Sequence, residues 1–205
     1  MVGPTRKHMA QRDRRFEVSE AAWRVIVREG LDRTSMRAIA QEMNCTTGVV
    51  THYFRNKQAL IMFALHQVTE RLQIKMAEAI APLTDISQVN ELDQFVAMLL
   101  SFLPFDQERQ DILQVWVAFL GYAVGRAELM AEHQKSAAQL RNVIIQALTT
   151  LQQQGRIRPD VEPAMEANTV LALVNGVSLD SLLQAERLSS GQQEIIIRRY
   201  VNSLC

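Results

Sequence analysis

The chain has 205 residues, with 22 Lys and Arg balancing 22 Asp and Glu, and its 48% apolar content excludes a disordered or collagen-like protein. That length is ample for a hydrophobic core, while no apolar run approaches the ~18 residues of a membrane-spanning helix and no secretory signal is visible. The two cysteines, Cys45 and Cys205, lie too far apart in sequence to indicate a disulfide framework or a metal site, so a reduced, cytoplasmic location is expected.

The chain is predicted to be helical throughout, because apolar residues recur at helical spacing and hairpin signals are scarce. In the first segment Val18, Ala22 and Ile26 recur every four residues, and Gly30 is a natural left-handed stop after them. Similar patterns continue to the C-terminus. The predicted helices span residues 11–29, 36–43, 47–54, 58–82, 91–103, 107–124, 129–154, 164–184 and 192–204.

Helix breakers separate these segments. Pro82 is expected to end the long helix that follows Lys57, and residues 83–90 form a polar connection. Asp106 can cap the helix that begins near residue 107, and Gly155 ends the helix over 129–154. The chain is therefore expected to fold as a series of packed helices.

Residues 35–54 carry the strongest functional signal, two short helices joined by a tight turn. Thr34 or Ser35 can cap the first helix and Thr46 the second. Asn44 stands in the turn, and asparagine is one of the few residues other than glycine that tolerate the left-handed conformation. This pattern predicts a helix-turn-helix, in which the second helix enters the major groove of DNA.

The outward side of the second helix is expected to contact DNA, since Val50 and Phe54 form its inner side at i and i+4. Hydroxyl and imidazole groups can bind bases or phosphates, a glycine lets the backbone approach closely, and cationic groups near the helix ends suit phosphates. The predicted DNA contacts are Arg37, Thr46, Thr47, Gly48, Thr51, His52, Tyr53 and Lys57.

The charge distribution supports this interpretation. Residues 1–60 hold eleven Lys and Arg against six Asp and Glu, a net +5, and residues 61–205 carry the opposite −5. A basic segment attracts a polyanion even when the whole chain is neutral. The basic residues before the first helix either reach DNA as an arm or form a solvated tail; they are Arg6, Lys7, Arg12, Arg14 and Arg15.

Residues 15–60 resemble the DNA-binding domain of the tetracycline-repressor (TetR) family. The family typically has Gly where Asn44 stands and often Tyr where Thr51 stands, and these are the two departures. The recognition-helix pattern over 47–57 and the segment 171–189 look like the choline-responsive betaine-synthesis repressor branch. The matching positions are Ala21, Ala22, Gly30, Thr34, Ile39, Ala40, Gly48, Tyr53, Phe54, Lys57 and Leu60.

The resemblance implies an all-α fold with an N-terminal three-helix bundle containing the helix-turn-helix in residues 1–57. A larger helical ligand-binding and dimerisation domain is expected in residues 58–205. The implied function is a dimeric repressor released from a double-stranded DNA operator by a small molecule; an activator or a regulator without an effector is the alternative. Scattered histidines and the lack of a phosphate loop or a nucleophile motif argue against an enzyme, a metal site or a cofactor.

A dimer is expected, because helix-turn-helix proteins bind half-sites about one helical turn (~34 Å) apart. The resemblance implies a four-helix bundle of the helices over 129–154 and 164–184 from both subunits. Alternatively, the interface side of the second helix packs only within its own core. The predicted interface residues line one side of that helix or permit close approach; they are Leu171, Val174, Gly176, Ser178 and Leu182.

The middle helices supply aromatic side chains for a ligand. Phe102, Trp116, Phe119 and Tyr122 could hold a small apolar molecule, or a quaternary ammonium by cation–π attraction. The branch resemblance makes choline one candidate effector. An aromatic core that holds no ligand is the alternative.

Overall fold

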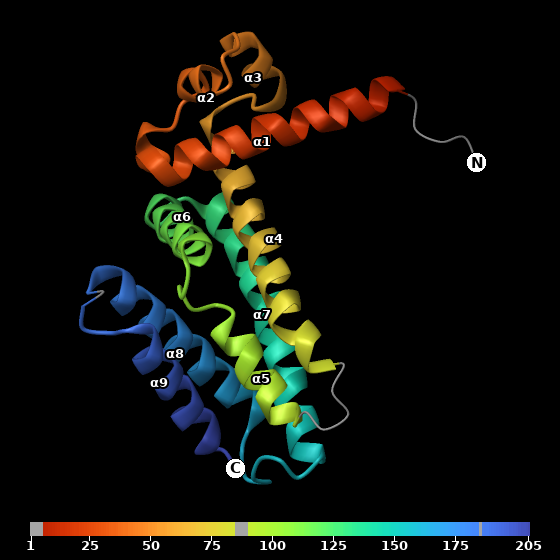
Figure 1. Cartoon of the computed structure of the whole chain (residues 1–205), viewed down its shortest axis with the longest axis vertical. Helices are drawn as coiled ribbons and strands as arrows, with labels where there is room; N and C mark the ends of the chain where they lie inside the picture. The colour runs from red at the N-terminus through yellow and green to blue at the C-terminus, as the bar shows by residue number, and fades with distance from the viewer. Residues whose placement is uncertain (1–5, 85–89, 185) are drawn as a thin grey trace. The chain divides into compact units, whose positions relative to one another are not determined.

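A computed structural model describes residues 6–84, 90–184 and 186–205, and all regular structure within them is helical (Figure 1). The predicted all-α fold is therefore confirmed. The helices are α1 (Arg6–Arg33), α2 (Met36–Glu42), α3 (Thr47–Tyr53), α4 (Lys57–Thr84), α5 (Glu91–Leu100), α6 (Gln107–Ala123), α7 (Ala127–Gln153), α8 (Pro163–Leu183) and α9 (Ser190–Asn202).

The contacts divide the chain into two compact units. Unit 1 comprises Met1–Val68 and Gln114–Arg126, and unit 2 comprises Thr69–Leu113 and Ala127–Cys205. The expected boundary after residue 57 lies inside unit 1, because α4 is one continuous helix whose first turns pack with the N-terminal helices. The second half of α6 also belongs to unit 1.

Unit 1 is built on the apolar side of α1. Val18, Ala22 and Ile26 are buried, as their spacing predicted. Gly30 has a φ of +77° and a ψ of 165°, so the regular α-helix is interrupted there before the chain continues to Arg33. The helix begins at Arg6, earlier than the predicted residue 11, although apart from Arg14 the basic side chains before Phe16 lie outside the described residues.

Unit 2 has its core between α5, α7, α8 and α9. Phe95, Leu99, Ile144, Leu148 and Ile197 are among its buried members. Because large apolar side chains from all four helices are removed from water together, this core is the main source of the unit's stability.

Capping residues set several helix ends in unit 2. Asn90 caps α5 by accepting from the Leu92 N–H at 3.1 Å, and Asp106 accepts from the Arg109 N–H at 2.9 Å at the start of α6. A capping box of Ser189 and Gln192 starts α9 two residues before the predicted position. The predicted connection over 83–90 lies largely outside the described residues.

Within the described parts of the chain, no helix is both long and apolar enough to cross a membrane. Nor do three or more His, Cys, Asp or Glu side chains gather there as metal ligands would.

Candidate nucleic-acid interface

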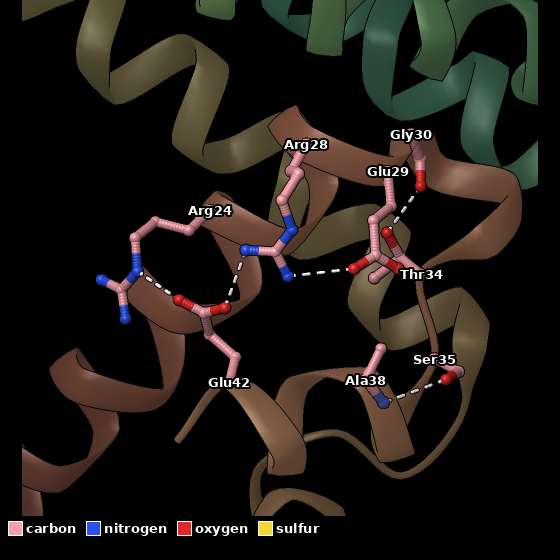
Figure 2. Close-up of polar contacts among 8 residues, drawn as sticks. All are labelled: Arg24, Arg28, Glu29, Gly30, Thr34, Ser35, Ala38 and Glu42. Carbon is pink, nitrogen blue, oxygen red and sulfur yellow. Dashed lines mark hydrogen bonds and ion pairs between the residues drawn. The ribbon is translucent and has the colours of Figure 1, made fainter. Parts of the chain in front are cut away.

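The junction of α1 and α2 is held by two hydroxyl groups (Figure 2). Buried Thr34 donates from its Oγ1 to the carbonyl oxygen of Gly30 at 2.6 Å. Ser35 accepts from the Ala38 N–H at 3.1 Å and is the N-cap of α2. Of the two residues that the sequence offered for this role, Ser35 is therefore the cap and Thr34 is the anchor of the preceding turn.

The turn between α2 and α3 depends on Asn44. Its φ is +51°, and it is the one non-glycine residue with a positive φ among those that the structure describes. Two backbone bonds fold the turn back onto α2, from Asn44 N–H to Gln41 at 3.1 Å and from Cys45 N–H to Ala40 at 2.9 Å. The predicted left-handed turn is confirmed.

The inner side of helix α3 is packed into the core of unit 1. Val50 is completely buried and Phe54 is nearly so, and the Phe54 ring packs against Phe63 of α4 with centroids 5.2 Å apart. Thr46 is the backbone N-cap, but its side chain makes no capping bond, so the predicted cap bond is wrong. The Thr46 residue is exposed instead.

The outward side of α3 is open to solvent. Thr47, Gly48, Thr51 and His52 are all exposed, and their spacing places them on one side of the helix. Thr51 donates from its hydroxyl to the Gly48 carbonyl at 3.2 Å, so that carbonyl is partly satisfied within the helix. The structure thus brings together the residues that the sequence predicted to read DNA.

Tyr53 and Arg37 are two further predicted DNA contacts. Tyr53 is half-buried and packs edge-on against the His52 ring, with centroids 5.1 Å apart. This contact restrains the imidazole beside the open side of α3. Arg37 is exposed on α2.

Lys57 begins α4 and makes contacts that the sequence did not predict. Its Nζ donates to the Asp32 carbonyl at 2.8 Å and lies 5.9 Å from the centroid of the Tyr122 ring of α6. The Arg126 guanidinium lies over the same ring at 3.9 Å. A residue predicted to bind phosphate and a residue predicted to bind ligand therefore meet within unit 1.

A carboxylate that sequence reasoning missed links α2 to α1 (Figure 2). Glu42 Oε1 accepts from Arg24 Nε at 2.9 Å, and Glu42 Oε2 accepts from Arg28 Nη1 at 2.8 Å. The hydrogen bonds from Arg24 and then Arg28 hold the pKa of Glu42 below its ordinary value. A usable signal existed, because two arginines at i and i+4 on α1 are available to the one acidic residue in 35–54.

The four aromatic residues predicted to bind ligand are distributed over both units. Trp116, Phe119 and Tyr122 belong to unit 1, where Phe119 is completely buried and the other two are half-buried. Phe102 belongs to unit 2 and packs against its core.

The residues predicted for the dimer interface do not share one environment. Val174 and Ser178 are buried in unit 2, whereas Leu171 and Leu182 are half-buried and Gly176 is exposed. The core of the same protomer thus covers part of the predicted side of α8. The large apolar side chains exposed on α8 and α9 are Met165, Leu179, Leu183 and Ile195.

Two family models match the chain. The model described as "Bacterial regulatory proteins, tetR family" matches residues 19–62, and "BetI-type transcriptional repressor, C-terminal" matches residues 92–205. The second match covers more than half of the chain; it includes α6 to α9 and all of α5 except its first residue.

Curated relatives and solved structures agree with these models. The HTH-type transcriptional regulator PksA of Bacillus subtilis (strain 168) is 26% identical, over 97% of this chain and 93% of that protein. The HTH-type transcriptional regulator BetI of Vibrio vulnificus (strain YJ016) is 25% identical, over 92% and 90%. A putative transcriptional regulator from Saccharomonospora viridis, solved in complex with choline, has the same fold, with a TM-score of 0.80, 20% identity and coverage of 92% and 95%.

These relatives and families are transcriptional regulators rather than enzymes. An exposed recognition helix on a buried base is the arrangement that such proteins use to reach the major groove. The chain belongs to the tetR family of bacterial regulatory proteins and has a C-terminal domain of the BetI-type transcriptional repressors.

Proposed function

We propose that this repressor binds its operator as a homodimer through the open side of α3, in the cytoplasm, and leaves it when a small organic effector binds the C-terminal domain. The observation that carries the proposal is the division of α3. Val50 and Phe54 fix the helix from inside, while Thr47, Thr51 and His52 stand exposed on the other side. Short polar groups on a rigid helix are suited to base edges and phosphates.

The proposed contacts have different roles. Thr47 and Thr51 read base edges, Gly48 allows close approach of the backbone, and His52 binds a base or a phosphate. The remaining contacts are assigned to phosphates, which position the protein without carrying sequence information directly. They are Arg37, Thr46, Tyr53 and Lys57.

Selection from a random pool of DNA duplexes tests this assignment. The wild-type chain should enrich one motif, with binding that weakens as salt rises. Thr47→Ala should enrich a changed motif, because a base contact is removed. If the wild-type chain enriched no motif, operator binding by this surface would be ruled out; if Thr47→Ala lost only general affinity, the base-reading role would be wrong.

The proposed effector is a small apolar or cationic organic molecule. The BetI-type C-terminal domain supports this class, as does the choline complex of the Saccharomonospora viridis regulator. Half-buried Trp116 and Tyr122 offer aromatic faces in unit 1, which also holds buried Phe119, whereas Phe102 belongs to unit 2 and stays a separate prediction. Aromatic faces attract quaternary ammonium groups through their quadrupoles.

A thermal shift experiment tests the cationic choice. Choline is compared with 3,3-dimethyl-1-butanol, in which a neutral carbon replaces the ammonium nitrogen while the shape is kept. Recognition by cation–π attraction predicts that choline raises the melting temperature and the neutral analogue does not. Equal shifts would favour an apolar effector, and no shift with either would remove choline from the candidates.

The proposed dimer interface is the exposed apolar side of α8 and α9. Gly176 lies on it, with Leu179, Leu183 and Ile195 exposed nearby in sequence. Leu171 and Leu182 are half-buried, and we retain them as flanking residues. A two-fold interface uses the same patch on both subunits, so one substitution acts twice.

Light scattering after size-exclusion chromatography tests this interface. Leu183→Asp should give a folded monomer with weak operator binding, because a charge on each side is buried against apolar surface. Val143→Asp is the matched control, since Val143 is 42% exposed on α7, the other helix that the sequence predicted for the interface. A dimer that survives Leu183→Asp but not Val143→Asp would place the interface on α7 instead.

A further inference from the structure

The geometry points to Glu42 as a positioning residue for operator binding: by bridging Arg24 and Arg28 it fixes α2 against α1, and so sets the orientation of α3. This inference rests on the proposed role of α3 as the DNA-reading helix. Glu42 itself touches no DNA in the proposed assignment.

Glu42 accepts two hydrogen bonds from donors on successive turns of one helix, α1. Arg24 and Arg28 are one turn apart on α1, and each binds a different oxygen of the same carboxylate, at 2.9 and 2.8 Å (Figure 2). A single ion pair between two helices leaves them free to swivel about it. Two bonds that share one planar carboxylate restrict rotation as well as separation.

The place of Glu42 in α2 shows that its charge needs a partner outside that helix. It is the last residue of α2, whose last turn holds no basic residue. The C-terminal end of a helix carries partial negative charge, so an acid there is unfavourable by itself. The arginines of α1 supply the compensation, and α2 is thereby tied to α1 at the end nearest to α3.

The turn passes this restraint on to α3. The N–H groups of Asn44 and Cys45 bond to the carbonyls of Gln41 and Ala40, at 3.1 and 2.9 Å. The turn residues are thus attached to the same last turn of α2 that carries Glu42. A change in the direction of this turn changes the direction in which α3 leaves it.

The charge balance argues that Glu42 acts through geometry rather than by attraction. Arg28 also pairs with Glu29 at 2.9 Å, so Arg24, Arg28, Glu29 and Glu42 sum to zero charge. This cluster adds no net attraction for phosphate. The arginine side chains are about half exposed, at 54% and 55%, so each ion pair contributes little to folding stability.

Glu42→Gln in the full-length chain tests the inference with two DNA probes. One is the duplex that the wild-type chain selects from a random pool, and the other is a shuffled duplex of the same composition. We expect affinity for the selected duplex to fall about tenfold per dimer, because in both protomers the Gln amide carries no charge and keeps only one of the two acceptor oxygens. Affinity for the shuffled duplex should stay constant or rise, since a negative charge near DNA has been removed.

Glu17→Gln is the matched control. Glu17 pairs with Arg14 at 2.7 Å within α1, so this variant removes the same charge without loosening a tie between helices. It should change the affinities for both probes by the same factor. A loss of folded protein would also lower both affinities together, so the ratio of the two affinities isolates positioning from stability.

The inference is overturned if Glu42→Gln changes both affinities by the same factor. Should that variant unfold at the assay temperature, Arg24→Gln and Arg28→Gln each keep one of the two bonds and should each lower the ratio by about threefold. Equal affinity ratios for these variants and the wild-type chain would equally overturn it. A wild-type chain that selects no duplex would instead refute the proposed function.

Discussion

Replacing Lys57 by Met separates its two predicted roles, because Met keeps most of the length of the side chain and removes the charge. In the free protein the Lys57 ammonium bonds to the Asp32 carbonyl at 2.8 Å in an exposed position. A hydrogen bond from a charged group in that setting contributes about 1 kcal/mol or less to stability. The variant should therefore fold, with a melting temperature lower by no more than about 4 °C.

The effect on DNA binding should be larger and of a different kind. Losing one phosphate contact per protomer removes two per dimer, so the slope of log K against log salt should decrease by about 1.8. Between 50 and 200 mM salt, the loss of affinity should then be about tenfold smaller than for the wild-type chain. Fluorescence anisotropy with the selected duplex over this salt range measures the slope.

Lys135→Met is the control for this measurement, because Lys135 is an exposed lysine of α7 in unit 2. It should leave the slope unchanged. If Lys57→Met lowered affinity without changing the slope, Lys57 would act on DNA binding only through Asp32 and the fold of unit 1. An unchanged affinity and slope would exclude any contact with phosphate.

Three further predictions concern unit 1. Gly30→Ala should lower the free energy of unfolding by ~1–3 kcal/mol, measured by chemical denaturation, because a φ of +77° strains any residue with a side chain. No atom lies within 4 Å of the added Cβ, so a steric clash does not contribute. A loss below about 0.5 kcal/mol would contradict this reasoning. Ser35→Ala should cost about 1 kcal/mol through loss of the cap to Ala38, whereas Ser35→Asp should keep that stability. The pKa of Glu42 is lowered from its ordinary 4.5, chiefly by its hydrogen bond from Arg24, so its stabilising effect is present above that pH and is lost as the pH falls through the folded value. The difference in melting temperature between the wild-type chain and Glu42→Gln should accordingly shrink between pH 7 and pH 3, and a constant difference would refute the linkage.

Local signals made much of the helix-turn-helix predictable. Gly30, Ser35 and Asn44 act on their own backbone or on atoms three or four residues away, so the sequence around them contains the relevant information. The inner side of α3 was also predictable, because Val50 and Phe54 are one turn apart. Thr46 shows where such local prediction fails: it stands at the N-cap position of α3, as predicted, but its side chain makes no capping hydrogen bond.

Long-range contacts were not predictable in this way. Lys57 and Tyr122 are 65 positions apart, and no periodicity says that an ammonium of α4 will lie near a ring of α6. Periodicity on α8 identified an apolar side but not what covers it. Val174 and Ser178 are buried within their own protomer. Helical spacing alone cannot distinguish burial in the protomer's own core from burial against a partner subunit.

Two cations of the protein itself already lie near the Tyr122 ring: the Arg126 guanidinium is 3.9 Å from the ring centroid and the Lys57 ammonium is 5.9 Å from it. A quaternary ammonium that used this ring would compete with these two cations, and its measured affinity would be the intrinsic affinity multiplied by the fraction of protein in which the ring is free of them. A neutral molecule that displaced these cations would not replace their electrostatic attraction to the ring. The competition therefore disfavours a neutral ligand at this ring relative to a cationic one. If the proposed effector is cationic, side chains that never touch it would thus partly set its affinity.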